Sequence, residues 1–428
     1  MALYNDKLTI VGGQIPRGDV IVSGAKNSAT RLLAASSICD TPVKLTGYPT
    51  NLVDSKHKQR FLQANGAKVE CSEDSILADY SNYLSVDLDD YFFPIRTTYL
   101  LVAGQLKKSG IARIPYPGGC NIGARKYDMH IMVWESFGCV VTEKENHIEV
   151  RAPDVILATN IAFPISTVGG TENALLCASI AEGTSIITNA YITPEIEDLI
   201  AFLNQCGVGV SVIGGSEIHV KGSPYISGGE YKVMADRIEA ITWIVYAALS
   251  GGSITVHNVP FDSMTIPLMH LKNCGLDFYQ NTDSIHVSSN CFKNGIHSFE
   301  VACGTHPGII SDMQPFFVML ALVAKGISRV HDFRYPERVT YVKELNKLLE
   351  NEVAYENGLI TITGDNKFIS GEANSSDLRG TMAAVIAGLC AKEGTTTING
   401  VSMALRGYND LPQKLKTLGV EVTYSDSE

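Results

Sequence analysis

The chain has 428 residues, with 34 Lys and Arg against 45 Asp and Glu, so its net charge at neutral pH is −11. Hydrophobic residues at 45% and charged residues at 18% are typical of a soluble globular protein and exclude disorder, collagen-like repeats and coiled coil as the main architecture. The charge argues against a general nucleic-acid binder, which needs a broad basic face, although a pocket for a small anion can be locally basic. At roughly 150 residues per domain, the length predicts about three domains.

The N-terminal residues lack the long apolar stretch of a signal peptide, and the longest apolar run, residues 316–324, is far shorter than a membrane span. None of the ten cysteines forms a C-x-x-C pair, so a zinc site is not expected. The apolar surroundings of Cys177 and Cys390 favour buried free thiols. These features predict a cytoplasmic protein with no metal, no membrane contact and no nucleic-acid partner.

The elements predicted in chain order repeat one pattern: an apolar helix, a short turn and a β-branched strand. Its copies occupy residues 32–47, 99–116, 175–189, 247–258, 320–332 and 386–399. Asp40 and Thr41 take the turn of the first copy. The other turns carry a glycine every 68 to 74 residues, at Gly110, Gly183, Gly252, Gly326 and Gly394. An order repeated at a near-constant period indicates a repeat architecture.

A second pattern alternates with the first: an amphipathic helix, a glycine at its end and a β-hairpin, as in residues 196–220 and 264–287. The copy near Leu349 and Glu350 has no glycine, which predicts an irregular helix end there. In the other copies the glycines are Gly66, Gly138, Gly207, Gly275 and Gly419. With a leading strand, each repeat of 428/6, or about 71 residues, has the order βαβαββ.

The sequence therefore predicts an α/β protein of six βαβαββ repeats in two domains of three. A repeat of this size buries too little surface to be stable alone, so the copies should pack together. The predicted domains are residues 24–232 and residues 1–23 plus 233–428. The strand at 7–13 is left over from the first half and is expected to cross back and complete the second.

Residues 23–28 (Ser-Gly-Ala-Lys-Asn-Ser) follow a predicted strand and precede an apolar helix from Leu32 onward. A turn of small residues at a helix start exposes backbone N–H groups, and Lys26 adds a positive charge, which suits a phosphate or carboxylate. The segment is not a P-loop, because G-x-x-x-x-G-K-[ST] is absent. The alternative is a capped helix start with a solvated lysine.

Residues 117–125 (Pro-Gly-Gly-Cys-Asn-Ile-Gly-Ala-Arg) are the most unusual segment of the chain. Three glycines predict a mobile loop with Cys120 at its tip, and Arg125 would lower the pKa of that thiol and raise its reactivity. The segment thus indicates a reactive thiol delivered over an anionic ligand. The alternative is a glycine-rich hairpin turn that contains a cysteine by chance.

Asp312 lies where the helix of the fifth repeat is predicted to begin, so the sequence favours an N-cap. The alternative is a general base acting on a substrate hydroxyl. Arg96, Arg338, Arg379 and Arg406 also lie near predicted turns and helix starts. Each taken alone is typical of a surface residue, but several on packed repeats would form a site for a carboxylate or phosphate.

Together these segments resemble the enolpyruvyl transferases, and most closely the branch whose acceptor is UDP-N-acetylglucosamine. The resemblance spans nearly the whole chain. It implies an inside-out α/β barrel in which two domains, each of three βαβαββ units, close over a cleft. Its carriers are residues 23–27 (Ser-Gly-Ala-Lys-Asn), 117–120 (Pro-Gly-Gly-Cys), 122–125 (Ile-Gly-Ala-Arg), Thr171 with 181–184 (Ala-Glu-Gly-Thr), 194–196 (Pro-Glu-Ile), 236–239 (Asp-Arg-Ile-Glu), 311–314 (Ser-Asp-Met-Gln), 377–379 (Asp-Leu-Arg) and 406–408 (Arg-Gly-Tyr).

The resemblance implies that phosphoenolpyruvate transfers its enolpyruvyl group to a sugar hydroxyl and releases phosphate, by addition and then elimination. Cys120 would be the general acid toward phosphoenolpyruvate, able to form a covalent adduct, and Asp312 would take the proton of the acceptor hydroxyl. Lys26 and Arg406 would complete the catalytic set. Domain closure would exclude water, and no metal or cofactor is implied. The phosphoenolpyruvate-binding residues would be Lys26, Arg96, Arg125, Arg338, Arg379 and Arg406.

The resemblance also implies a uridine nucleotide sugar as the second substrate, on the first committed step of peptidoglycan synthesis. Fosfomycin, an epoxide that alkylates the loop thiol, would inactivate such an enzyme, and a monomer or weak homo-oligomer is expected. The implied acceptor-binding residues are Asn27, Arg96, Lys126, Tyr127, Asp128, Met129, Thr167, Val168, Gly169, Asp312 and Val330.

Three segments depart from the family pattern on the acceptor side. Residues 125–130 read Arg-Lys-Tyr-Asp-Met-His where the family usually has Arg-Pro-Val-Asp-Leu-His, a stretch that helps to hold the uracil. Residues 165–169 read Ile-Ser-Thr-Val-Gly instead of Lys-Val-Ser-Val-Gly, which removes a lysine that meets the diphosphate. Residues 26–31 read Lys-Asn-Ser-Ala-Thr-Arg instead of Lys-Asn-Ala-Ala-Leu-Pro. Lys126 could replace the missing charge.

These departures leave a close alternative open, in which the same reaction uses a different nucleotide or nucleotide-sugar acceptor in secondary metabolism, of the nucleoside-antibiotic type. A different class of protein is also open: a non-catalytic relative that binds ligands or regulates a partner. The presence of Cys120, Asp312, Lys26 and Arg406 favours the enzyme.

Overall fold

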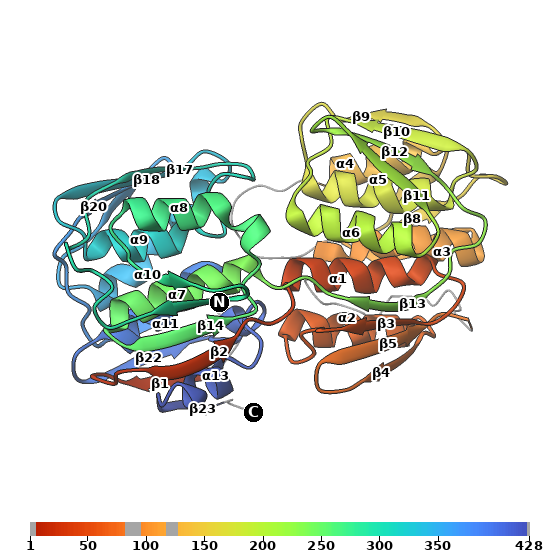
Figure 1. Ribbon diagram of the computed structural model, residues 1–428. Helices are drawn as coiled ribbons and strands as arrows, with labels where there is room; N and C mark the ends of the chain where they lie inside the picture. Colours follow the sequence, from red (N-terminus) through yellow and green to blue (C-terminus); the bar gives the residue numbers. More distant parts are fainter. Residues whose placement is uncertain (1–5, 82–95, 117–126, 426–428) are drawn as a thin grey trace. The chain divides into compact units, whose positions relative to one another are not determined.

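The structure, a computed structural model, describes residues 6–81, 96–116 and 127–425 (Figure 1). These residues form two compact units. Unit 1 comprises residues 6–23 and 235–425, and unit 2 comprises residues 24–81, 96–116 and 127–234. The assignment of the units as separate domains stays a prediction.

The third repeat, in unit 2, shows the architecture that the sequence predicts. Its sheet has the strand order β9-β10-β12-β11, in which β9 is parallel to β10 and the other neighbours are antiparallel. The elements are β9 (Asn160–Ala162), α5 (Val168–Ile180), β10 (Thr184–Thr188), α6 (Pro194–Gln205), β11 (Gly209–Ile213) and β12 (Glu217–Lys221). The chain order is therefore βαβαββ, as expected.

The fifth repeat, in unit 1, has the same order, with the sheet β17-β18-β20-β19. The second repeat contributes β6, β8 and β7 among the described residues. The elements of the two repeats are β17 (Glu300–Cys303), α9 (Gln314–Leu322), β18 (Ile327–Asp332), α10 (Val342–Leu345), β19 (Ala354–Glu356), β20 (Leu359–Thr363), η2 (Arg96–Leu101), α3 (Val102–Ser109), β6 (Ile111–Pro115), α4 (Asp128–Ser136), β7 (Val140–Glu143) and β8 (His147–Arg151).

The first and fourth repeats exchange their leading strands. In chain order β2 (Arg17–Ile21) precedes the first repeat, yet it pairs in parallel with β14 (Ser253–His257) of the fourth. Conversely, β13 (Gly229–Lys232) precedes the fourth repeat and pairs in parallel with β3 (Val43–Thr46) of the first. The remaining strands of these two sheets are β4 (Lys68–Cys71), β5 (Ser75–Asp79), β15 (Tyr279–Gln280) and β16 (Ser284–Val287).

The N-terminal strand completes the last repeat. β1 (Lys7–Val11) lies between β22 (Thr395–Asn399) and β23 (Val422–Ser425) and is antiparallel to both, and β21 (Glu372–Asn374) is parallel to β22. β1 thus occupies the place that the fourth strand of the repeat has elsewhere. The prediction that the strand at 7–13 crosses back to the second half is confirmed.

The most buried helices lie inside each unit, and the sheets lie outside them (Figure 1). In unit 1, α7 (Arg237–Ser250), α9 and α11 (Leu378–Cys390) contact one another, and all residues of α9 are buried. Figure 1 shows these helices between the sheet of β17, β18 and β20 and the strands β14, β1 and β22. A helix that is apolar all round is stable only in such a core, where each large side chain contributes roughly 2 kcal/mol.

Unit 2 is arranged in the same way around α1 (Lys26–Ala35) and α5, which both contact η2, and α3, which contacts η2 and α5. The predicted inside-out α/β barrel is confirmed. The elements that remain are α2 (Val53–Ala64), α8 (Thr265–Asn273), α12 (Ser402–Leu405), α13 (Leu411–Thr417), η1 (Ser36–Ile38), η3 (Phe261–Ser263), η4 (Pro336–Val339) and η5 (Asn346–Leu348).

The glycines that end the amphipathic helices, Gly66, Gly138, Gly207, Gly275 and Gly419, have the left-handed backbone that the sequence predicts. In the fourth repeat, Gly251 ends α7 with a φ of +65°, and the turn glycine Gly252 follows it. A Cβ on Gly252 would lie 2.3 Å from the carbonyl oxygen of Pro16, so the close approach of two backbones requires a glycine. In the fifth repeat the helix is only the short α10 followed by η5, which confirms the irregular end expected near Leu349.

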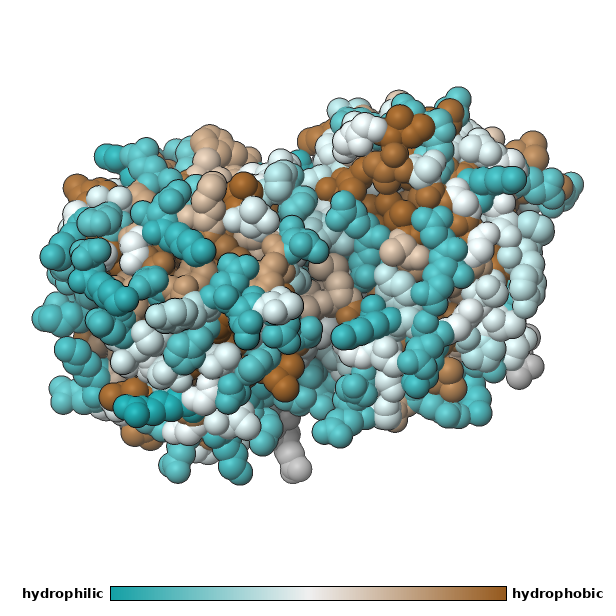
Figure 2. Space-filling model, in the orientation of Figure 1, coloured by the Kyte–Doolittle hydropathy of each residue, from teal (hydrophilic) through white to brown (hydrophobic). Residues whose placement is uncertain are grey.

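Most of the face visible in Figure 2 is hydrophilic, with apolar areas interspersed on both units. Within the described ranges, the helices are all too short or too polar to cross a membrane.

Candidate active site

Unit 1 brings together the starts of α7, α9 and α11. Asp236 caps α7 by accepting from the backbone N–H groups of Ile238 and Glu239, at 2.8 and 3.0 Å. Asp377 caps α11 in the same way, through the N–H groups of Arg379 and Gly380 at 3.0 and 3.3 Å. The helix dipoles make such helix starts favourable for anions.

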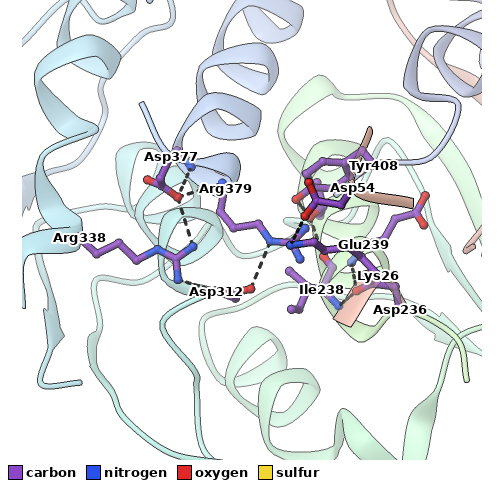
Figure 3. A network of polar contacts seen from close by, with 12 residues as sticks. Lys26, Asp54, Asp236, Ile238, Glu239, Asp312, Arg338, Asp377, Arg379 and Tyr408 are labelled. Atoms are coloured by element: carbon purple, nitrogen blue, oxygen red, sulfur yellow. Dashed lines mark hydrogen bonds and ion pairs between the residues drawn. The ribbon is translucent and has the colours of Figure 1, made fainter. Parts of the chain in front are cut away.

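Asp312 does not cap a helix, so that interpretation of the sequence is wrong. α9 begins two residues later, and its N-terminus has no side-chain cap. Asp312 instead accepts a hydrogen bond from Nη1 of Arg338, and its Oδ2 lies 3.5 Å from Nε of Arg379 (Figure 3). Arg338 also donates through Nη2 to Oδ1 of Asp377, at 3.2 Å. The predicted residues Asp312, Arg338 and Arg379 therefore form one cluster.

The two arginines of this cluster are buried. Burial opposes the charge of Arg338, but Asp312 and Asp377 outweigh it and raise the pKa of the guanidinium. Burial also opposes the charge of Arg379, whose pKa is raised by Tyr408, Asp312 and Asp236. Both groups therefore stay cationic.

Arg379 differs from Arg338 in what its terminal nitrogens contact. Nη1 and Nη2 of Arg379 are buried and, apart from the hydroxyl of Tyr408, have no hydrogen-bond partner among the described residues. A Cβ on Gly407 would lie 3.2 Å from Nη1, and the ring of Tyr408 lies 5.1 Å from the guanidinium carbon. Arg406, also buried, directly precedes this pair. Buried donors with so few partners are costly, and a carboxylate or phosphate oxygen bound to this guanidinium would offset that cost.

Asp332 bonds to the segments that carry Asp312 and Arg338, and sequence reasoning missed it. Its Oδ1 accepts from Oγ of Ser311 at 2.9 Å and from the N–H groups of Arg334 and Tyr335 at 3.0 and 2.8 Å. Burial raises the pKa of this carboxyl, against these hydrogen bonds. The position at the end of a strand is the one signal that could have indicated it.

In unit 2, Lys26 is the first residue of α1, so the helix begins earlier than Leu32, where the sequence places it. Its Nζ lies 3.1 Å from Oδ2 of Asp54 on α2, and only 18% of the Lys26 side chain is exposed. The interpretation as a solvated lysine is therefore wrong. Asp54, which sequence reasoning missed, holds the lysine at the start of the helix.

Residues 28–31, which depart from the family pattern, have side-chain partners inside unit 2. Oγ of Ser28 donates to Asp198 on α6, and Arg31 pairs with Glu172 on α5. The hydroxyl of Thr30 bonds to the carbonyl of Lys26 within α1, at 3.1 Å. Burial raises the pKa of both Asp198 and Glu172. Ser28 and Arg31 thus connect α1 to α6 and α5. Asn27, the second residue of α1, is half-buried.

Arg96 begins η2 and lies over the ring of Tyr99, at 5.9 Å. Tyr99 in turn stacks on His130, with 3.7 Å between the ring centroids. Burial, followed by the charge of Arg96, lowers the pKa of His130 to about 3. His130 is therefore a neutral residue of the interior.

Six of the residues predicted to bind the acceptor lie at the starts of two helices that pack together. Tyr127 precedes α4, which begins with Asp128 and Met129; Thr167 caps α5, which begins with Val168 and Gly169. A Cβ on Gly169 would lie 3.1 Å from Nε2 of His130. The hydroxyl of Tyr127 bonds to Glu143 at 2.7 Å, and this bond raises the pKa of the phenol to about 12. Ile165, at the position of the missing lysine, is 56% exposed.

Four further predicted residues are not placed at these helix starts. Cys120, Arg125 and Lys126 lie outside the described residues. Val330 is fully buried in β18, between Val301 and Ile360. The structure gives no support to a contact between Val330 and a ligand.

The family description of EPSP synthase (3-phosphoshikimate 1-carboxyvinyltransferase) matches residues 10–415. The chain belongs to this family of enolpyruvyl transferases. Among its curated relatives, UDP-N-acetylglucosamine 1-carboxyvinyltransferase of Caulobacter vibrioides is 31% identical over 97% of both chains. UDP-N-acetylglucosamine 1-carboxyvinyltransferase 1 of Legionella pneumophila is 34% identical over 96% of this chain and 81% of the relative.

The solved structures of two enolpyruvyl transferases share the fold. The enolpyruvyl transferase NikO from Streptomyces tendae aligns with a TM-score of 0.86 and 20% identity, over 99% of this chain and all of its own. EPSP synthase from Acinetobacter baumannii aligns with a TM-score of 0.75 and 16% identity, over 98% of this chain and all of its own. The predicted family, fold and class of enzyme are thereby confirmed.

Proposed function

We propose that this enzyme transfers the enolpyruvyl group of phosphoenolpyruvate to a hydroxyl of UDP-N-acetylglucosamine and releases phosphate, on the first committed step of peptidoglycan synthesis in the cytoplasm. The names of its curated relatives, which match over almost the whole chain, support this acceptor. The observation that carries the proposal is the cluster of Asp312, Arg338 and Arg379 in unit 1.

This cluster combines a base with a site for an anion. Nη1 and Nη2 of Arg379 have no carboxylate partner among the described residues, so they can bind two oxygens of a carboxylate or phosphate while Nε keeps its contact with Asp312. Arg338 already uses both terminal nitrogens for Asp312 and Asp377. We therefore assign anion binding in this cluster first to Arg379, and the positioning of Asp312 to Arg338. Arg406 and, in unit 2, Lys26 and Arg96 would supply further positive charge, with Arg125.

The reaction follows from these roles in two steps. In the addition, Asp312 takes the proton of the acceptor hydroxyl, the oxygen bonds to C2 of phosphoenolpyruvate, and Cys120 gives a proton to C3. In the elimination, C3 loses a proton, the double bond re-forms, and the bond between C2 and the phosphate oxygen breaks. Fixed cations stabilise the charge of the intermediate and of the leaving phosphate without reorganising.

On the acceptor side, the starts of α4 and α5 offer N–H groups and positive dipole ends for the diphosphate. Thr167, Val168 and Gly169 would contact this group. The residues that would contact the nucleoside and the sugar are Asn27, Arg96, Lys126, Tyr127, Asp128, Met129 and Asp312.

A second acceptor is favoured by one specific observation, the exposed Ile165 where the family has a lysine that meets the diphosphate. An apolar side chain there cannot offset the charge of a diphosphate. The alternative function is therefore the same transfer to a nucleotide with less phosphate charge, in secondary metabolism. In the leading version, Lys126 supplies the missing charge.

An acceptor panel separates the two versions. Phosphate release from phosphoenolpyruvate is measured with UDP-N-acetylglucosamine, with UMP and with uridine as acceptors. Turnover with UDP-N-acetylglucosamine supports the proposal. Absence of release with this sugar nucleotide, together with turnover of UMP or uridine, would replace it with the alternative.

A further inference from the structure

We propose that Lys58 is a positioning residue that ties helix α1 to the 3-10 helix η2, and so fixes the spacing of Lys26 and Arg96. The inference rests on the function proposed above, in which both of these cations act on the substrates. It concerns unit 2 alone.

Lys58 lies on α2 and is fully buried. Its Nζ donates to the carbonyl oxygen of Thr30 at 3.0 Å, and to the carbonyl oxygen and Oγ1 of Thr97 at 3.0 and 2.6 Å. An ammonium has three N–H donors, and these three oxygens take all of them. The two acceptor residues lie on different elements, because Thr30 belongs to α1 and Thr97 to η2.

Each of these acceptors lies next to a residue of the proposed site. Thr30 is one helical turn after Lys26 on α1, and its hydroxyl also bonds to the carbonyl of Lys26. Thr97 directly follows Arg96, the first residue of η2. Lys58 therefore connects the helix that presents Lys26 and Asn27 to the one that presents Arg96.

The same face of α2 contacts α1 a second time. Asp54, one turn before Lys58, pairs with Lys26 at 3.1 Å. α2 thus fixes the start of α1 through Asp54 and its middle through Lys58. Two contacts one turn apart restrain both the position and the rotation of a helix, which a single contact does not.

The charges around Lys58 indicate that it is not there for stability. Its three acceptors are uncharged oxygens, and a buried cation without a direct carboxylate partner costs free energy. Glu172 on α5 and Asp54 on α2 favour its charge, while Arg31 and Lys26 on α1 oppose it. Burial is the largest effect and lowers the pKa of Lys58 to about 7. A costly residue between two segments of the proposed site is typical of a site in which position outweighs stability.

The test compares Lys58→Met with Lys56→Met, the same change at an exposed position of the same helix. Hydrogen–deuterium exchange of α1 and η2 reports the position of the helices without any substrate. Steady-state kinetics report the effect on phosphoenolpyruvate. Thr97→Val, which removes only the Oγ1 acceptor, serves as a graded third variant.

We expect faster exchange in α1 and η2 of Lys58→Met, a smaller increase in Thr97→Val, and no change in Lys56→Met. The kcat/KM for phosphoenolpyruvate should fall about ten-fold or more in Lys58→Met. The ratio of the wild-type kcat/KM to that of Lys58→Met should also decrease from about pH 6 to about pH 9, because the ammonium loses its proton. A merely structural role would not give this pH dependence.

Unchanged exchange in Lys58→Met would overturn the proposal, and so would faster exchange with an unchanged kcat/KM. If the wild type turns over none of the acceptors, the proposed function fails, whereas the exchange experiment still decides whether Lys58 ties α1 to η2.

Discussion

Arg379 contacts Asp312 through Nε, at 3.5 Å from Oδ2, and its two terminal nitrogens take no part in that contact. Arg338 approaches the same carboxylate with Nη1 and uses Nη2 for Asp377. The two arginines therefore have the same partner but different capacity for a substrate, and this difference can be measured.

Arg379→Lys should lower kcat/KM for phosphoenolpyruvate on the order of a hundred-fold, because a lysine cannot bind two oxygens with a planar fork. Arg329→Lys is the matched control, since Arg329 forms an exposed pair with Glu300. Steady-state kinetics on both variants check the expectation. Equal kinetics for the two variants would remove Arg379 from the site.

Arg338→Met should instead lower the free energy of unfolding by about 3 to 5 kcal/mol, because it leaves the buried Asp377 without its cationic partner. Urea unfolding of the wild type and the variant measures this change. If stability is unchanged and only the affinity for phosphoenolpyruvate falls, Arg338 binds the substrate directly and the division of roles between the arginines is wrong.

Fosfomycin should inactivate the enzyme by adding one molecule to the thiol of Cys120. Intact-protein mass spectrometry followed by peptide mapping locates the adduct, and Cys120→Ser should carry none. Full activity after incubation, with no mass added at Cys120, counts against the loop cysteine as the reactive thiol. Retained turnover in a Cys120→Ser/Asp312→Ala double variant would contradict both assigned roles.

His130 should make the folded protein sensitive to acid. Its pKa is lowered by burial to about 3 in the fold, so the unfolded chain binds the proton more readily below about pH 6.5. Stability is therefore complete above this pH and is lost as the pH falls toward 3. Between about pH 7 and pH 5 the wild type should lose about 2 kcal/mol more than His130→Asn. Chemical unfolding at both pH values measures this difference, with a change at an exposed histidine, His297→Asn, as the control. If the wild type and His130→Asn lost the same free energy of unfolding, His130 would be protonated in the fold.

The repeat architecture could be predicted from the sequence because local patterns encode it. Glycines after helices, such as Gly66 and Gly207, adopt the left-handed backbone in which a side chain is strained, so their spacing marks each repeat. The strand at 7–13 was placed correctly because the count of elements left it without a partner in the first half. The predicted domain boundaries assign β2 to the second half and β13 to the first, but the strands with which they pair, β14 and β3, could not be predicted, because β2 and β13 have the same pattern.

The candidate site was only partly predictable, for a related physical reason. Motifs identify the charged residues at helix starts, such as Lys26 and Arg379, because the chemistry is local. The partners that hold them come from distant positions: Asp54, Asp332 and Lys58 act through tertiary contacts that no local pattern reports. The same limit explains why the prediction for Asp312 was wrong. Its position next to a helix start suggests a cap, but its carboxylate is bound by two arginines more than 20 residues away.

The most direct test of the central claim is to identify the product formed from carbon-labelled phosphoenolpyruvate and UDP-N-acetylglucosamine, by mass spectrometry and NMR. The proposal predicts a labelled enolpyruvyl ether on a hydroxyl of the sugar, formed in equal amount to the released phosphate. Recovery of unmodified UDP-N-acetylglucosamine, with the label transferred to UMP or uridine when either is supplied, would contradict it.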